Sequence, residues 1–357
     1  MGRILARDAT FAAPEQVKTA LARRGGSGEN PARSQEAARE SPRISAAVSR
    51  PLVTRLTDLA AYVAVRVAIC FVQALPRGTC ERWAHSLSHV LANRMRIRRG
   101  VVRENLRIAF PDMTAAEQRE TARAMWEHLL LMVVEIAHAN RVIHKTNWRQ
   151  HLRIHGMEEM VRLFWLDRPK VILSGHYGNF ELAAYLFGLF GLRIFSVARE
   201  LDNPLLDRFV TRFRESRGQI ILPKKGSAPD VALVLEENGA IGLLGDQSAG
   251  PKGCWVDFFG RPASVHKAIG VFALSASAPV LVCSATRRGG LFDFDLRLEG
   301  VADPADGTPE TGDLQSLSQW YTTILENAIR REPGQYWWVH RRWRSPPRKA
   351  RVTRPAA

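Results

Sequence analysis

The sequence predicts an α/β fold, a central sheet covered by helices, for residues 151–345. Short apolar runs alternate with amphipathic segments from about residue 154, which is typical of such sheets. The chain has 357 residues and is 46% hydrophobic, enough for one large core or two modest domains. A histidine and a carboxylate follow the first strong apolar run, where α/β sheets collect ligands and catalytic groups.

The elements of this region follow from the hydrophobic pattern. Strands are predicted at 170–174, 193–198, 219–222, 241–245, 280–285 and 292–298. Helices are predicted between them, at 180–190, 204–216, 229–237, 265–276 and 314–330.

An apolar segment at 52–75 is the most distinctive feature before the sheet. Its polar side chains share one narrow arc at 100° per residue: Arg55, Asp58, Tyr62, Arg66 and Gln73. As a helix it is long enough to cross a bilayer. Its charges favour docking in the membrane interface, with the polar stripe toward the protein or the headgroups. An ordinary amphipathic core helix is the alternative.

The predicted organisation has five parts: a disordered basic arm (1–50), a membrane-associated helix (51–76), a helical subdomain (77–150), the α/β core (151–345) and a basic tail (346–357). The arm has little apolar periodicity and lacks the apolar core of a secretory signal. Helices are expected at 81–95 and 115–140 in the subdomain. Thr114 and Glu117 form a capping-box pattern at the start of the second.

The net charge of +16 indicates an anionic partner. Nucleic acid, an anionic membrane surface and an acidic carrier protein all fit, and charge alone does not choose among them. The four cysteines are scattered without a C-x-x-C pair. This pattern argues against a disulfide framework or a zinc site and fits a reducing compartment.

His176 and Glu181 are the candidate catalytic residues. They lie where the run 171–173 breaks at Gly175 and Gly178 and a helix-like run begins. Residues five apart on a helix lie on different faces, so the two can meet only if His176 is on the turn. Asn179 is the expected N-cap. Glu181 would then orient the imidazole and leave its other nitrogen free to take a proton; a structural histidine beside a capping glutamate is the alternative.

The motif His176-x-x-x-x-Glu181 resembles the H-x-x-x-x-D/E signature of glycerolipid and lysophospholipid acyltransferases. Further blocks agree in order with the bacterial lipid A biosynthesis lauroyl/myristoyl acyltransferase family: 103–111, Arg199 with 203–207, 245–247 with 256–263, and 337–343. The resemblance covers roughly residues 52–345. It implies the mixed sheet of a glycerolipid acyltransferase-like fold.

The same resemblance implies an O-acyltransferase of lipid A and lipopolysaccharide biosynthesis on the cytoplasmic face of the inner membrane. A fatty acyl chain would pass from an acyl carrier protein thioester to a hydroxyl of a glycolipid acceptor, with coenzyme A left open as the carrier. His176 would be the general base and Glu181 its partner. No cofactor or metal is expected.

Substrate-binding roles follow for residues in the matching blocks. Arg199 would bind a phosphate, unless it only pairs with a neighbouring acid, and Asp246 would contact the acceptor sugar or order Arg199. Gln247 and Asn179 are weaker candidates. Phe258 and Phe259 would line the acyl channel or pack in the core.

The tryptophans near the C-terminus have two possible structural interpretations. Trp337, Trp338 and Trp343 would either lie at a headgroup interface or form an edge strand with the tryptophans inward.

Other functions remain open from sequence alone. A phosphatidylinositol mannoside acyltransferase or another membrane-lipid acyltransferase would share the motif. A non-catalytic lipid-binding protein and a nucleic-acid-binding protein are more distant alternatives, and nucleic acid is not expected because no binding signature accompanies the basic residues.

Overall fold

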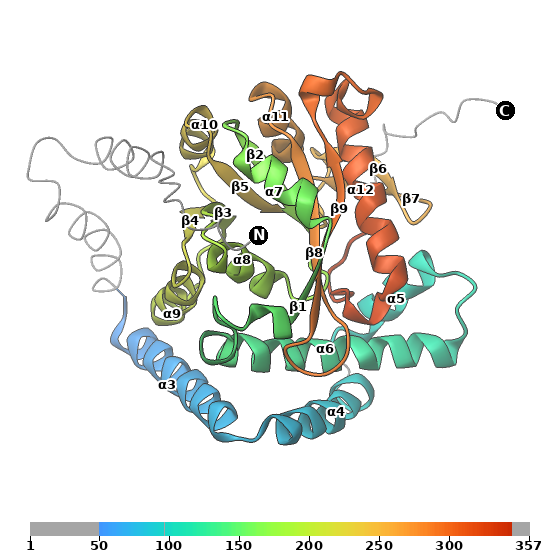
Figure 1. Ribbon diagram of the computed structural model, residues 1–357. Coiled ribbons are helices and arrows are strands. Elements are labelled where there is room, and N and C mark those ends of the chain that lie inside the picture. Colours follow the sequence, from blue (N-terminus) through green and yellow to red (C-terminus); the bar gives the residue numbers. More distant parts are fainter. Residues whose placement is uncertain (1–49, 96, 345–357) are drawn as a thin grey trace, which may run out of the picture.

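The computed structural model describes residues 50–95 and 97–344 (Figure 1). The predicted tail and the arm, apart from Arg50, lie outside these residues. A seven-stranded sheet has the order β1-β9-β8-β2-β5-β3-β4. Its strands are β1 (Leu152–His155), β2 (Lys170–Ser174), β3 (Ile194–Ala198), β4 (Gln219–Pro223), β5 (Ala240–Leu244), β8 (Val280–Arg287) and β9 (Phe294–Ala302). β8 and β9 are antiparallel and the other neighbours are parallel, so the mixed α/β fold is confirmed.

Helices cover both faces of the sheet because its central strands are apolar on both sides. In β2, Val171 and Leu173 pack on one face and Ile172 on the other. The first face carries α10 (Ala228–Glu236), α11 (Lys267–Ser275) and α12 (Leu314–Arg331). The second carries α7 (Met157–Trp165), α8 (Phe180–Leu189) and α9 (Pro204–Glu215).

The sequence pattern missed β1, α7 and a hairpin of β6 (Cys254–Phe258) and β7 (Arg261–Val265). The hairpin turn is Phe259-Gly260, with φ of 54° and 69°. Two central residues with positive φ form the tight turn that matches strand twist. Phe259 is an unusual residue at such a position, which hid the turn from sequence analysis.

The helical region before the sheet consists of α3 (Leu52–Ala74), α4 (Arg77–Asn93), α5 (Arg99–Ala109) and α6 (Ala115–Val142). The capping box predicted at the start of α6 is present. Thr114 N–H donates to Glu117 Oε2 at 2.7 Å, and Glu117 N–H donates to Thr114 Oγ1 at 3.3 Å. The residues between α6 and the sheet include the 3-10 turn Trp148–Gln150.

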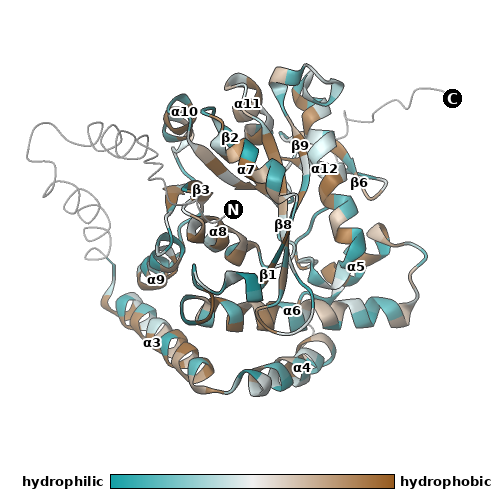
Figure 2. Cartoon of the chain, viewed as in Figure 1, coloured by the Kyte–Doolittle hydropathy of each residue, from teal (hydrophilic) through white to brown (hydrophobic). Residues whose placement is uncertain are grey.

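Helix α3 lies along the edge of the molecule and is apolar over much of its surface (Figure 2). Among the described residues it is the one helix long and apolar enough to cross a membrane. Most of its polar stripe faces the protein: Gln73 Nε2 donates to the Ala137 carbonyl, and the Arg66 guanidinium stacks on Phe209 of α9. The backbone carbonyl of Asp58 accepts from Asn203 Nδ2 at 2.9 Å. Its outer side chains are exposed: Leu52, Val53, Leu56, Leu59, Val63, Val67 and Phe71. This arrangement is the one expected of an interfacial helix whose polar stripe faces the protein.

Candidate active site

The site lies at the carboxyl ends of two neighbouring parallel strands, β2 and β5. Their last paired residues are Ser174 and Leu244. His176 and Asp246 each lie two residues beyond this pair, so the register of the sheet brings their side chains together. The pairing therefore depends on which strands are neighbours, not on local spacing.

Asp246 binds both the ring and the backbone of His176. The His176 Nδ1 atom lies 2.8 Å from Asp246 Oδ1, and the His176 backbone N–H donates to Asp246 Oδ2 at 3.0 Å. Both residues are buried. Burial lowers the pKa of His176, but the carboxylates of Asp246 and, to a smaller extent, Glu181 outweigh it and raise that pKa above its usual value. With the proton on Nδ1, the Nε2 lone pair is available as a base.

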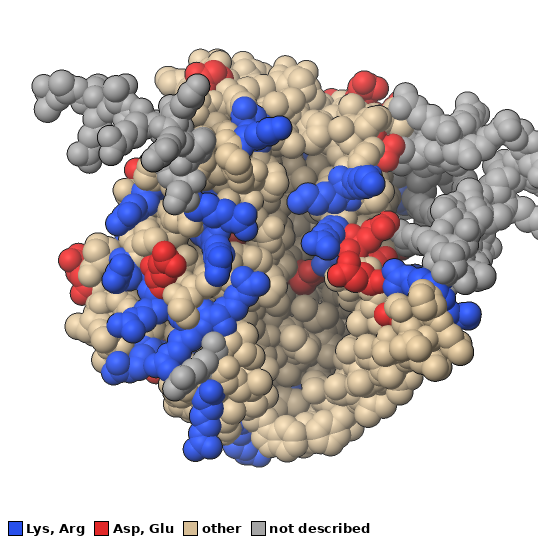
Figure 3. Space-filling model, turned by 180° about the vertical axis from the view of Figure 1, so that it is seen from behind, with Lys and Arg blue, Asp and Glu red and all other residues tan. Residues whose placement is uncertain are grey.

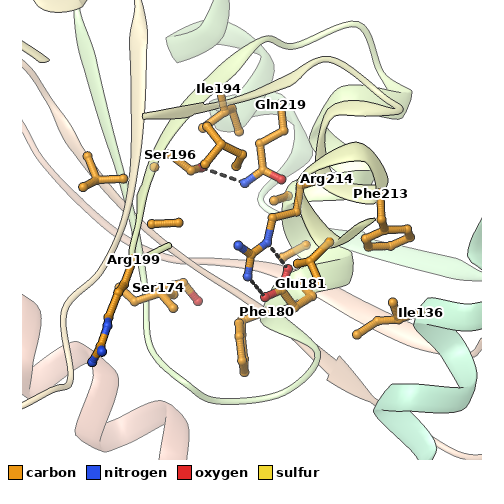
Figure 4. A pocket seen from close by; sticks show the side chains of 18 of the residues that line it. Ile136, Ser174, Phe180, Glu181, Ile194, Ser196, Arg199, Phe213, Arg214 and Gln219 are labelled. Atoms are coloured by element: carbon orange, nitrogen blue, oxygen red, sulfur yellow. Dashed lines mark hydrogen bonds and ion pairs between the residues drawn. The ribbon is translucent and has the colours of Figure 1, made fainter. Parts of the chain in front are cut away.

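The expected contact between His176 and Glu181 is wrong. Glu181 lies in the first turn of α8 and accepts two hydrogen bonds from Arg214 of α9, at 2.9 Å from Nε and 2.5 Å from Nη2 (Figure 4). The helix begins at Phe180, and its first turn directs Glu181 toward α9 rather than back to the histidine. Glu181 still lines the same cavity as His176.

The other nitrogen of His176 faces Gln247, whose Nε2 atom lies 3.2 Å from His176 Nε2. Trp337 packs against the imidazole with ring centroids 5.3 Å apart, and His340 lies at the same centroid distance. The Trp337 backbone N–H also donates to the His176 carbonyl at 3.0 Å. The C-terminal segment therefore packs against the ring and hydrogen-bonds to the backbone of His176.

Gly178 and Asn179 shape the turn that carries His176. Gly178 has a φ of 61°, and a Cβ there would lie 2.2 Å from the Ala285 carbonyl oxygen, so the position requires glycine. The Asn179 side chain caps α8 by accepting from Leu182 N–H at 3.0 Å. The N-cap prediction for Asn179 is therefore confirmed. Asn179 is fully buried and does not line the cavity, so the expected contact with substrate is wrong.

Phe258 and Phe259 are buried in a separate aromatic cluster with Trp338 and Trp343. The expectation that they line the acyl channel is wrong, because the hairpin turns them toward α5 and the C-terminal segment. The edge strand considered for 337–343 is wrong as well. In this segment Trp337 N–H donates to the His176 carbonyl and Trp338 N–H donates to the Tyr336 carbonyl. Asn105 of α5 donates to the carbonyls of Trp338 and His340 at 2.7 and 2.6 Å.

Arg199 follows β3, as predicted, and its side chain is 80% exposed at the cavity wall. Figure 4 shows it turned away from the Glu181–Arg214 pair. Its partner Asp202 lies 3.6 Å away and is itself 97% exposed, so the guanidinium remains free to bind an anion. Asp246 is buried behind His176 and does not line the cavity, which excludes the expected contact with an acceptor sugar.

A cavity of about 1460 Å³ opens in front of His176 and runs between the sheet and helices α8 and α9. It is larger than the roughly 300–1000 Å³ of ordinary small-molecule sites. Much of its lining is apolar and includes Ile172, Ala183, Phe187, Ile194, Phe213 and Cys283. Ser196 and Gln219 form a hydrogen-bonded polar pair inside it, at 2.7 Å (Figure 4). Tyr62, Arg66, Ile69 and Gln73 of α3 line it too.

Lys and Arg side chains gather beside a hollowed face of the molecule (Figure 3). Exposed arginines of α5 and of the turn before it include Arg98, Arg99, Arg103 and Arg107, and exposed Arg208 and Arg212 of α9 line the cavity. Arg208 and Arg212 therefore bring positive charge to the cavity wall.

Sequence reasoning missed Arg214, which pairs with Glu181, and assigned Asp246 to the substrate instead of to His176. The only signal for Asp246 was its place directly after a predicted strand, like His176 after its own. No local pattern marks Arg214, since it is one of several arginines on an amphipathic helix.

A buried carboxylate bound to a histidine, with the histidine lining a large and mostly apolar cavity on an α/β sheet, fits an enzyme of the acyltransferase class. The family profile described as bacterial lipid A biosynthesis acyltransferase matches residues 52–345. The chain belongs to this family, and the predicted enzyme class, an O-acyltransferase, is confirmed.

Two relatives from Escherichia coli agree with this assignment. The chain is 24% identical to the lipid A biosynthesis lauroyltransferase of Escherichia coli (strain K12) over 282 residues, which cover 77% of this chain and 89% of that protein. It is 24% identical to the lipid A biosynthesis palmitoleoyltransferase of the same organism over 70% of this chain and 80% of that one. The crystal structure of the 1-acyl-sn-glycerophosphate acyltransferase PlsC from Thermotoga maritima matches with a TM-score of 0.36 and 12% identity, over 73% of this chain and 98% of that chain.

Proposed function

We propose that this enzyme transfers a fatty acyl chain from an acyl carrier protein thioester to a hydroxyl of a lipid A precursor, with His176 as the general base and Asp246 orienting it. One observation carries the mechanism: Nδ1 of His176 is bound to a buried carboxylate, while the ring lines a long cavity. The names of the relatives support lipid A as the acceptor class.

The reaction needs no covalent enzyme intermediate. His176 Nε2 removes the proton from the acceptor hydroxyl as its oxygen attacks the thioester carbonyl. The tetrahedral intermediate then expels the thiolate of the carrier, which takes the proton from the imidazolium. An ester bond forms, a thioester bond breaks, and the thiol carries away the proton. No metal or cofactor is required, because the thioester is already an activated acyl group.

Gln247 marks the place of the acceptor hydroxyl. Its Nε2 atom occupies the position from which a hydroxyl would donate to His176 Nε2. The acceptor must displace this amide, which would then be free to donate to the developing oxyanion.

The backbone turn that carries His176 is a poor source of oxyanion donors. The N–H groups of His176, Gly178 and Asn179 already donate to Asp246, Gln335 and Ala285. We therefore assign oxyanion stabilisation to Gln247.

In this proposal Glu181 acts through charge and position. Its carboxylate contributes to the raised pKa of His176, and Arg214 holds it in the cavity wall. The ion pair also connects α8 to α9, so it fixes the distance between the two helices that enclose the acyl chain.

The membrane supplies the acceptor lipid. Helix α3 presents apolar side chains outward and lines the cavity with its inner face, so a lipid held in the interface would meet the cavity opening directly. This arrangement supports a location at the inner membrane. The arginines of α5 and α9 are suited to headgroup phosphates and to an acidic carrier protein on the cytoplasmic side.

The experiment that tests the proposal is mass spectrometry of envelope lipids from a strain lacking the gene. We expect lipid A that lacks one secondary acyl chain, which would identify acceptor and chain length together. Restoration by the wild-type gene but not by His176→Ala would assign the change to this site. Unchanged lipid A with an altered phospholipid would show that the acceptor is another membrane lipid.

A further inference from the structure

A buried polar network lies directly beneath the turn that carries His176, and the proposed reaction does not use it. Its members come from three elements: Glu135 and His128 from α6, Arg287 from β8, and Asn179 at the start of α8. All four are buried, and Glu135 and Asn179 are completely inaccessible.

The network is fully hydrogen-bonded. Glu135 binds the guanidinium of Arg287 at two positions, Oε1 to Nε at 2.6 Å and Oε2 to Nη2 at 2.7 Å. Asn179 Nδ2 donates to Glu135 Oε2 at 2.9 Å. Arg287 Nη1 donates to His128 Nδ1 at 2.9 Å, and His128 Nε2 donates to the Gly178 carbonyl at 3.1 Å.

His128 has one chemical state that satisfies both contacts. Its Nδ1 must accept from an arginine, so the proton lies on Nε2, which donates to Gly178. Burial and the charge of Arg287 lower the pKa of His128 to about 3. The imidazole therefore stays neutral over the working range of pH.

Stability alone is a weak explanation for these charges. Taking an ion pair out of water costs free energy that its attraction barely offsets, and apolar side chains of similar size are often as stable. The network instead fixes the orientation of the turn. It binds the carbonyl of Gly178 and the side chain of Asn179, which lie two and three residues beyond His176. These contacts connect α6 to the turn, where apolar packing would leave rotation free.

We propose that Glu135, Arg287 and His128 are positioning residues that hold the Gly178–Asn179 turn so that His176 stays in register with Asp246. The inference rests on the proposed role of His176 as the base. The network fixes the position of the imidazole ring, and Asp246 fixes its tautomer, so that Nε2 is the nitrogen without a proton.

Three single substitutions and one control test this proposal in the purified full-length enzyme. Asn179→Ser keeps a capping oxygen for α8 but removes the amide that donates to Glu135. His128→Leu removes the contact with Gly178, and His128→Gln can keep both an acceptor and a donor. Val234→Ala in α10 is the control: Val234 is fully buried in a different cluster, away from the site.

Asn179→Ser and His128→Leu should lower kcat about 100-fold, the usual cost of displacing a catalytic group by about 1 Å. KM should change little, because the cavity is unaltered. His128→Gln should recover most of kcat. Val234→Ala should lower the melting temperature without lowering kcat at a temperature where all variants are folded.

The pH profile separates positioning from general destabilisation. Three ionisable groups face His176: Asp246 after β5, Glu181 of α8 and His340 of the C-terminal segment. Burial alone lowers the pKa of His176, so a ring displaced from Asp246 loses the effect that raises it. The acid limb of kcat should therefore move to lower pH in Asn179→Ser and His128→Leu, and stay in place in Val234→Ala.

Wild-type kcat and an unmoved acid limb in folded Asn179→Ser would overturn the proposal, as would an equal loss of kcat in Val234→Ala. If His128→Leu does not fold, Asn179→Ser and His128→Gln carry the test without it. Failure of the proposed function has a different signature: His176→Ala would keep its activity whatever the network variants do.

Discussion

Replacing Asp246 by asparagine probes the orientation of the base most directly. The wild-type carboxylate accepts two hydrogen bonds, from the ring Nδ1 and from the backbone N–H of His176. An asparagine has one oxygen, which can satisfy only one of these donors, and its NH₂ group then faces the other. If the oxygen keeps the backbone contact, the amide donates to Nδ1 and the imidazole carries its proton on Nε2, where it cannot accept one from a hydroxyl.

The expected loss in kcat is about 10⁴-fold, the magnitude measured when an orienting carboxylate in a catalytic triad is replaced by its amide. The neutral base is the active form, so activity rises with pH through the pKa of His176. Asp246 raises this pKa and burial lowers it. The residual activity of Asp246→Asn should therefore show an acid limb shifted to lower pH.

The assay is transfer of a labelled acyl chain from the carrier thioester to a glycolipid in detergent micelles, followed from about pH 5 to 9. Circular dichroism and the melting temperature serve as folding controls. Asp246→Asn protein with wild-type kcat and an unshifted acid limb would refute the assigned role.

Three further outcomes follow from the same geometry. Glu181→Gln should lower kcat about 10-fold and shift the acid limb toward lower pH less than Asp246→Asn does, as measured in the same assay, because the second carboxylate contributes less to the pKa of His176. Arg199→Ala should weaken the binding or turnover of phosphorylated acceptors. If both the wild-type enzyme and the variant show equal kinetics with phosphorylated and dephosphorylated lipid, Arg199 forms only a surface ion pair. Gly178→Ala should lower the free energy of unfolding, measured by urea denaturation, by about 1–3 kcal/mol or more. The causes are the positive φ and a Cβ that would lie 2.2 Å from a carbonyl oxygen. A variant with wild-type stability would contradict the strained turn.

Local signals predicted much of the fold. The strand β2 and the helix α8 follow from an apolar run, two glycines and an asparagine that caps the helix, all within residues 171–190. The polar stripe of α3 was predictable because helical periodicity is local, although only the structure shows that the stripe faces α6 and α9.

The partner of His176 was not predictable, because it is set by strand order. Asp246 is 70 residues away in the sequence and meets His176 only because β5 lies beside β2. Glu181 is near in sequence but belongs to a helix turned toward Arg214. Phe258 and Phe259 were misplaced for a similar reason: a hairpin with positive φ at both turn residues directs them into the core.

The most direct test of the account is a reconstituted reaction of the purified enzyme with an acyl carrier protein thioester and a lipid A precursor, analysed by mass spectrometry. We expect the wild-type enzyme to give a product heavier by one ester-linked acyl chain. His176→Ala, folded and membrane-associated, should give no product above background. Wild-type product formation by His176→Ala, or wild-type enzyme that only hydrolyses the thioester, would contradict it.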